Sequence, residues 1–280
     1  MPERNLEMAA RIDAAEVRYP YSFVVAGDSG AWPDPTADAI FCQLLRQAAA
    51  ADPVFFAQLG DFAGPGTPER HQDYLRLVEG LPVPNVCVVG NHDLDDPGGR
   101  EAWAAVHGPV NFEFAFGHTR FLAIDAAPGD LGEIDIPATN GPGEEALAFL
   151  EERLAAAEEP HSVVLMHCPP AFGGRFEPHP EWGFADEERF LELVRRHEVD
   201  LVCCAHALLF DQHVRDGTRF VVTGGGGTGL CSHFRGICAP GDGRPEDRGA
   251  LFHAVEIVVQ EDGAMTGRVH QAFGGVRFEF

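Results

Sequence analysis

Short apolar segments that end in polar residues recur through the first part of the chain. Residues 22–26, 54–59 and 86–89 are apolar, and they precede Gly27-Asp28, Gly60-Asp61 and Gly90-Asn91. The intervening segments 37–51 and 68–80 begin and end with residues typical of helix boundaries. Because strand, polar tip and helix follow one another repeatedly, the pattern predicts parallel strands joined by helices.

The rest of the chain predicts strands of mixed direction. We expect a hairpin at 111–116 and 120–125, helices at 142–158 and 186–197, and further strands at 163–166, 201–204, 220–223, 252–259 and 267–272. Segments 169–184 and 232–249 are rich in Gly and Pro, which predicts surface loops. Since no linker or repeat divides the sequence, we expect a polar N-terminal arm over 1–20 and a single domain over 21–280.

Charge and cysteine content narrow the range of functions. The 20 basic residues are all arginine, the acidic residues number 44, and the net charge is −24. Because the chain has no lysine, it cannot form a lysine Schiff base and it cannot have the phosphate-binding lysine of a P-loop. So strong a negative field repels nucleic-acid polymers and anionic membranes, and we expect neither as a partner.

The 7 cysteines are odd in number and include no Cys-x-x-Cys pair, which predicts free buried thiols in a reducing compartment. The N-terminus lacks the apolar core of a secretory signal, and no segment approaches the roughly 18 apolar residues of a membrane helix. We therefore expect a cytoplasmic protein.

Residues that can bind metal follow five of the predicted strands. They are Asp28, Asp61, Asn91-His92-Asp93, His167 and His206. Each tip alone is consistent with a turn, or with a buried histidine. Polar tips of parallel strands converge at one edge of a sheet, however, and Asp, Asn and His suit Mn, Fe or Zn ions. The ordered set therefore predicts a metal centre.

The order of these blocks resembles the calcineurin-like metallophosphoesterase superfamily, whose motifs are G-D-x-H, G-D, G-N-H-D/E, a later His and G-H-x-H. Gly27-Asp28-Ser29-Gly30 and the sequence Val-Leu-Met-His that ends at His167 are closest to its purple acid phosphatase branch. The resemblance implies an α/β fold, namely a four-layer αββα sandwich of two mixed β-sheets flanked by helices.

The resemblance also implies roles for individual residues. Asp61 would bridge two ions, and Asn91, His167 and His206 would complete the shell of one of them. Asp28 would belong to the other ion. His92 would act on the leaving oxygen or the phosphoryl group, and Asp93 would orient the His92 ring.

Three departures from the superfamily pattern affect one ion only. Gly30 stands where G-D-x-H has its His, Gly64 where the purple branch has a Tyr, and Leu208 where the last block ends in His. We therefore expect one tightly bound ion and a second that is weak or absent. Replacement ligands from His213, Asp211, His233 or Asp34 are alternatives that the sequence leaves open.

Two further features have both a functional and a structural interpretation. The glycine-rich segment 224–229 could cradle a dinucleotide, although close backbone approach to the site is favoured because no helix start follows it. In the loop 171–184, Arg175 could bind a substrate phosphate, or the aromatic residues could simply anchor the loop. His213 and His233 are further candidates for substrate binding.

These observations predict a metal-dependent phosphoesterase that hydrolyses a small phosphate monoester or diester. Two alternatives stay open. One is a non-catalytic relative that binds one metal or a phosphate ligand, and the other is a mononuclear hydrolase of a different bond.

Overall fold

The structure is a computed structural model that describes residues 3–127, 141–170, 186–230 and 251–280. Its α-helices are α1 (Arg4–Asp13), α2 (Pro35–Ala50), α3 (Pro68–Val78), α4 (Gly99–Val106), α5 (Glu144–Ala155) and α6 (Glu187–Arg196). Its strands are β1 (Tyr21–Ala26), β2 (Phe56–Leu59), β3 (Asn85–Val88), β4 (Phe112–Phe116), β5 (Thr119–Ala123), β6 (His161–Leu165), β7 (Leu201–Cys204), β8 (Phe210–Arg215), β9 (Thr218–Thr223), β10 (His253–Val259), β11 (Met265–Gln271) and β12 (Gly275–Glu279). A 3-10 turn, η1 (His92–Leu94), follows β3.

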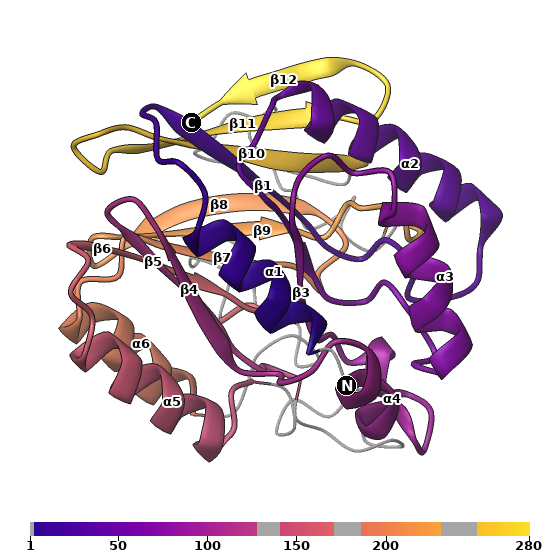
Figure 1. The fold of residues 1–280 in the computed structure, drawn as a ribbon, viewed down its shortest axis with the longest axis horizontal. Coiled ribbons are helices and arrows are strands. Elements are labelled where there is room, and N and C mark those ends of the chain that lie inside the picture. The colour runs from indigo at the N-terminus through magenta and orange to yellow at the C-terminus, as the bar shows by residue number, and fades with distance from the viewer. Residues whose placement is uncertain (1–2, 128–140, 171–185, 231–250) are drawn as a thin grey trace, which may run out of the picture.

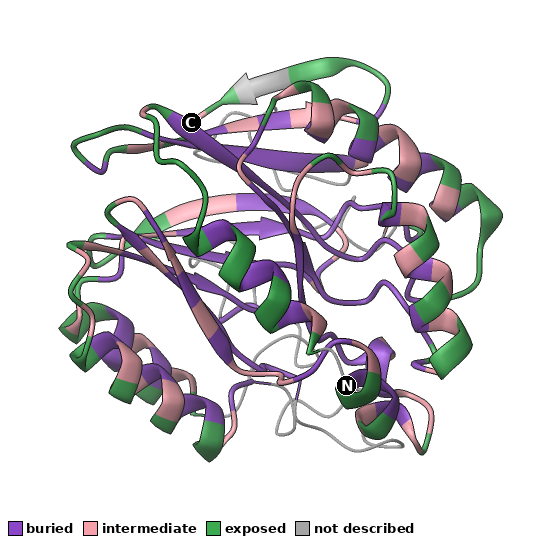
Figure 2. Ribbon diagram, viewed as in Figure 1, coloured by how far each residue is buried: buried purple, intermediate pink, exposed green. Residues whose placement is uncertain are grey.

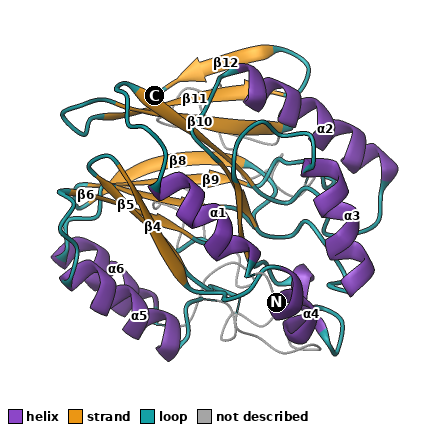
Figure 3. Cartoon of the chain, in the orientation of Figure 1, coloured by secondary structure: helices purple, strands orange, loops and turns teal. Residues whose placement is uncertain are grey.

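The strands form two six-stranded sheets of mixed direction (Figure 1). One sheet has the order β12-β11-β10-β1-β2-β3, in which β1, β2 and β3 are parallel. The other has the order β4-β5-β6-β7-β9-β8, in which β5, β6, β7 and β9 are parallel. Helices α2 and α3 lie beside the first sheet and α5 and α6 beside the second (Figure 3). The predicted αββα sandwich is therefore confirmed.

Alternation along the strands supplies both faces of each sheet with apolar side chains. In β1, Phe23 and Val25 belong to the core between the sheets, whereas Val24 and Ala26 pack toward α2. Successive side chains of a strand point to opposite faces of the sheet, so a strand that is covered on both faces is apolar at every position. Figure 2 accordingly shows the central strands buried and the outer faces of the helices exposed.

The N-terminal segment corrects one expectation. Residues 1–20 were expected to form a polar arm outside the domain, but α1 contributes Met8, Ala9 and Ile12 to the core between the sheets. The buried Asn5 side chain pairs with the backbone of Cys87 in β3 at 2.9 Å in both directions. Helix α1 lies against β3 and β4, the edge strands of the two sheets, so the segment is part of the domain.

Other elements differ from expectation only in detail. Helices α1 and α4 and the strands β8 and β12 were not expected, whereas the remaining strands and α-helices lie within a few residues of their predicted bounds. The two predicted loops lie mostly outside the described residues. Among the described helices, none has both the length and the apolar character that crossing a bilayer requires.

Two buried histidines lie beneath the loop that follows β2. The Nε2 atom of His107 lies 3.2 Å from Nδ1 of His71, and both side chains are fully buried against Phe62 and Trp103. Burial lowers the pKa of His71 to about 4 and that of His107 well below its usual value. Both rings are therefore neutral in the folded protein at neutral pH.

Low pH should destabilise the folded protein, because His71 and His107 are protonated only when the chain unfolds. In the unfolded chain the two histidines bind protons below about pH 6.5, whereas the folded pair stays neutral there. The free energy of unfolding therefore keeps its full value above that pH and falls as the pH drops toward 4. We expect His71→Gln to reduce the slope of the unfolding free energy against pH by about 1.4 kcal/mol per pH unit in this range. Urea unfolding at a series of pH values measures this slope. His118→Gln, at an exposed position, should leave the slope unchanged; an unchanged slope in His71→Gln would contradict the assignment.

Candidate metal centre

Three of the predicted ligands occupy a backbone region that most residues avoid. Asp28, Asp61 and His206 follow β1, β2 and β7 and have φ angles of 59°, 57° and 66°. Asp and His tolerate the left-handed region better than branched residues do. The chain turns sharply at each strand end, and the turns direct these residues to a common point.

Four ligand atoms from four strand ends meet within hydrogen-bonding range. The Oδ1 atom of Asn91 lies 3.1 Å from Nε2 of His167 and 3.0 Å from Nδ1 of His206. The two histidine nitrogens are 3.3 Å apart, and Nε2 of His167 lies 3.3 Å from Oδ2 of Asp61. The structure thus brings these four sequence-predicted residues together.

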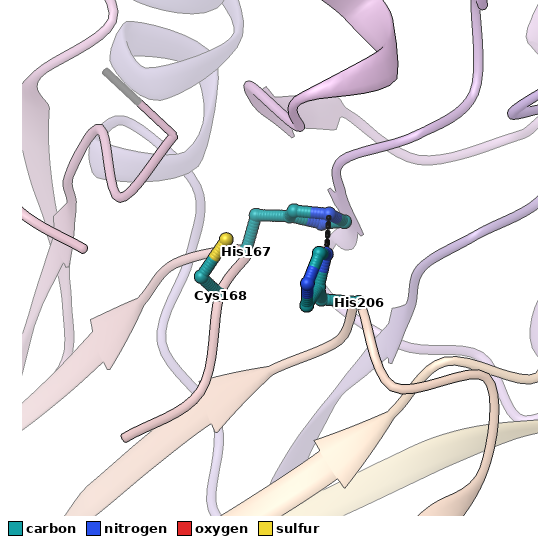
Figure 4. A group of neighbouring side chains, drawn as sticks. All are labelled: His167, Cys168 and His206. Carbon is teal, nitrogen blue, oxygen red and sulfur yellow. Dashed lines mark hydrogen bonds between the residues drawn. The ribbon is translucent and has the colours of Figure 1, made fainter. Parts of the chain in front are cut away.

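The tautomer of His167 makes this cluster suitable for a cation. Its Nδ1 donates to the backbone carbonyl of Leu59 at 2.7 Å, so Nε2 is the atom that would offer its lone pair to a cation once it has lost its proton. Nε2 faces the oxygens of Asn91 and Asp61, and a shared proton or a shared cation satisfies these acceptors. Figure 4 shows the His167 and His206 rings facing one another, with the Cys168 sulfur beside them and not between them. Burial raises the pKa of the Cys168 thiol, which keeps it protonated.

The charges of the site attract a cation. Burial would lower the pKa of His167, but the carboxylates of Asp61 and Asp28 outweigh burial and raise it to about 9. Asp61 has a lowered pKa, because His167 and His92 outweigh the effect of its burial. Burial raises the pKa of Asp28, and the charge of Asp61 adds to this effect.

The donor set fits a transition-metal ion. Ligands bound at roughly 2.1 Å lie about 3.0 Å apart around an octahedral ion and about 3.4 Å apart around a tetrahedral one. The observed separations of 3.0 to 3.3 Å fall in this range. Asp28 adds a buried Oδ1 atom that has no hydrogen-bond partner among the described residues. Mixed oxygen and imidazole donors suit Mn, Fe or Zn.

Asp93 has a different role from the one expected. Its Oδ2 accepts from the backbone N–H groups of Asp61 and Gly90 at 2.8 and 2.9 Å. Its Oδ1 accepts from Phe62 and Ala63 at 2.9 and 2.8 Å. Burial and Asp61 raise the pKa of Asp93 to about 6, while these N–H donors act to lower it. Asp93 therefore joins the loops after β2 and β3.

The carboxylate that contacts the His92 ring is Asp95, which the sequence analysis missed. Oδ2 of Asp95 lies 2.7 Å from Nδ1 of His92, while the His92 backbone N–H donates to Asp61 at 2.9 Å. Burial would lower the pKa of His92, but Asp61 and Asp95 raise it to about 9. The spacing of three residues between His92 and Asp95 could have revealed this contact, because side chains three residues apart lie on the same side of a 3-10 turn.

Comparison with known proteins assigns the family. The profile described as calcineurin-like phosphoesterase matches residues 21–209, which include every predicted ligand. The chain belongs to the calcineurin-like phosphoesterase family. A comparison with curated proteins finds no match.

Solved structures show the same fold as this chain. A purple acid phosphatase from yellow lupin has 18% sequence identity and a TM-score of 0.69, covering 93% of this chain and 53% of its own. This chain thus spans about half of the lupin chain. A dimetal phosphatase from Danio rerio has 14% identity and a TM-score of 0.68, covering 93% of this chain and 98% of its own. GAP50 of Plasmodium, named as the anchor in the inner membrane complex, has 15% identity and a TM-score of 0.66, covering 93% and 87%.

In this family member, backbone fills the space at two of the positions where the family pattern has a ligand. A Cβ atom at Gly64 would lie 1.8 Å from the carbonyl oxygen of Ala31, and one at Gly30 would lie 2.6 Å from that of Phe62. The N–H of Gly64 donates to Gly30 at 3.0 Å, and that of Gly30 donates to Asp61 at 2.9 Å. No side chain fits at either position.

The other candidate residues are either absent from the ligand groups of the described chain or lie outside it. Among the described residues, groups of potential ligands within 4.8 Å include Asp28 with Asp61 and His167, but not His213, Asp211 or Asp34. Asp34 accepts from Thr36 at the start of α2, and the His213 ring stacks on Phe220. Arg175 and His233 lie outside the described residues.

Removing the charge of Asp93 should disrupt the centre. In Asp93→Asn, an NH₂ group must face two backbone N–H donors, which we expect to lower the unfolding free energy by about 3 kcal/mol. Urea unfolding at pH 7.5 measures this, and metal retained after dialysis should fall in parallel. Asp262→Asn is the matched control, since Asp262 accepts only one backbone bond in an exposed turn. Equal stability of the two variants would contradict the joining role of Asp93.

Substitution of Gly64 should be strongly destabilising. In Gly64→Ala the new methyl group overlaps the Ala31 carbonyl, so we expect a loss of about 2 to 3 kcal/mol. Gly80→Ala is the control, because a Cβ atom there meets nothing within 4 Å and should change stability by less than about 1 kcal/mol. Thermal and urea unfolding of both variants compare them; a tolerated Gly64→Ala would show that the two loops can separate.

Proposed function

We propose that this family member hydrolyses a small phosphate monoester or diester, using one tightly held ion. The observation that supports this most directly is the convergence of Asn91, His167, His206 and Asp61 beside His92. Ligands and a proton-transfer residue at the same strand ends are what metal-assisted hydrolysis requires.

The residues of the chain would divide the reaction between them. When bound, the ion supplies positive charge that polarises a phosphoryl oxygen and makes water more acidic. Asp95 holds Nδ1 of His92, which leaves Nε2 as the ring atom that can deliver a proton to the leaving oxygen. The Leu59 carbonyl fixes the ring of His167 in the same way. Buried Asp28 holds the loop of His206 by accepting its backbone N–H at 2.8 Å.

Charge and thiol content support the remaining parts of the proposal. A net charge of −24 opposes a polymeric nucleic acid, so the substrate is a small phosphorylated molecule that the ion can secure. Cys87, Cys168, Cys203 and Cys204 are buried free thiols, which are compatible with a reducing cytoplasm.

One observation favours a second candidate function. The close approach of the Ala31 and Phe62 carbonyls leaves no room for ligands at Gly64 and Gly30. Phosphate-ester hydrolysis by paired ions needs both metal positions. A protein that holds one ion or a phosphate ligand without turnover is therefore the alternative, together with a mononuclear hydrolase of another bond.

Metal content and turnover distinguish these functions. After dialysis against metal-free buffer, we expect about one equivalent of Mn, Fe or Zn per chain, lost in His167→Ala. With added Mn, the protein should hydrolyse p-nitrophenyl phosphate or its bis-ester. His92→Gln should keep the ion but lower kcat by about 100-fold or more, because the proton donor is gone.

Controls separate the outcomes. His118→Gln, far from the centre in sequence and exposed, should retain both metal and activity. Two tightly held equivalents would overturn the single-ion proposal and imply replacement ligands. One equivalent without turnover of any phosphate ester would support the binding protein instead.

A further inference from the structure

A large exposed aromatic residue lies against the proton-transfer residue of the centre. The Trp32 side chain is 54% exposed, yet its ring centroid lies 4.7 Å from that of His92, with the planes tilted by 54°. The other described tryptophan, Trp103, is 1% exposed. Tryptophan gains much from being covered, since its side chain can bury about 150 to 250 Å². The open face of Trp32 is thus available to a ligand at this site.

The backbone on both sides of Trp32 is held in place. On one side, Ala31 is buried and its N–H donates to Oγ1 of Thr228 at 3.1 Å. On the other side, the Pro33 ring restricts its own φ angle, and Asp34 caps α2 by accepting from Thr36 at 2.8 Å. The tryptophan therefore extends from a fixed segment, which reduces the entropy lost when a ligand stacks on it.

The same glycines that displace metal ligands hold this segment. Gly30 accepts from the N–H of Gly64, and the carbonyl of Ala31 approaches Gly64 so closely that no side chain fits. Two changes from the family pattern thus bring the Trp32 loop onto the loop after β2. Positions that would serve a second ion instead support an aromatic surface beside the first.

We propose that Trp32 is the stacking surface for the leaving group, and that the substrates are phosphate esters whose leaving group carries a flat ring. The proposal rests on the proposed function, because His92 places the leaving oxygen next to Trp32. Stacking adds affinity that does not depend on charge, which matters in a chain with a net charge of −24. Aryl and nucleoside groups share this ring chemistry, and the substrates tested below distinguish them.

Binding can be measured without turnover by titrating the Mn-loaded protein with phenylphosphonate and methylphosphonate, whose carbon–phosphorus bonds are not hydrolysed. Their affinity ratio should favour the phenyl compound in the wild type and fall by about tenfold in Trp32→Leu. Trp32→Phe keeps a ring and should retain most of the preference. Phe273→Ala, which removes a side chain 76% exposed beyond β11, should leave the ratio unchanged.

Turnover then identifies the ring. We expect kcat/KM for phenyl phosphate or adenosine 5′-monophosphate to fall by about tenfold in Trp32→Leu, with glycerol 3-phosphate little affected. The larger of the two losses assigns the leaving group as aryl or nucleoside.

Three results would overturn the stacking role. If Trp32→Leu keeps the full preference for the phenyl compound, Trp32 does not stack on the leaving group, and the proposed function is unaffected. Equal losses for all substrates with a displaced pH–rate profile would make Trp32 a positioning residue for His92. A wild-type protein that retains its ion but binds neither phosphonate, and hydrolyses no ester, would remove both proposals.

Discussion

The geometry of the centre depends on one buried carboxylate. Asp93 accepts four backbone N–H groups, three from the loop after β2 and one from the loop after β3. Charge-assisted bonds of this kind are stronger than neutral ones, and they are made here without competition from water. They set the position of Asp61 relative to Asn91 and His92. Because Asp61 in turn accepts the N–H of His92, ligand and proton donor are fixed as one unit.

Much of this arrangement follows from the sequence. Parallel strands place the residues that follow them at the same end of a sheet, so Asp61 and Asn91, after β2 and β3, could be placed together before their distances were known. His167 follows β6 of the other sheet and joins them because the two sheets pack face to face. The central strands were equally clear, because they are apolar on both faces. Strands β8 and β12 gave little signal, because they are edge strands in which polar residues separate the few apolar ones, as in loop sequence.

The remaining features depend on contacts that no local pattern contains. The sequence shows that Gly30 and Gly64 lack ligand side chains, but their direct pairing joins residues 34 positions apart and requires the folded loops. The contact with the His92 ring was assigned to Asp93, and Asp95 was missed, for a similar reason. Both carboxylates follow His92 closely, and only the 3-10 geometry of η1 decides which of them reaches the ring.

Helix α1 has a consequence for how the two sheets stay together. It covers β3 and β4, which are the edge strands on the same side of the sandwich. Its Met8 and Ile12 side chains enter the space between the sheets, and Asn5 satisfies the outward backbone groups of Cys87. A chain cut after Asp13 would therefore expose two unpaired strand edges and an open apolar seam. Such edges are templates for intermolecular pairing, so proteolysis there would make the fold prone to aggregation.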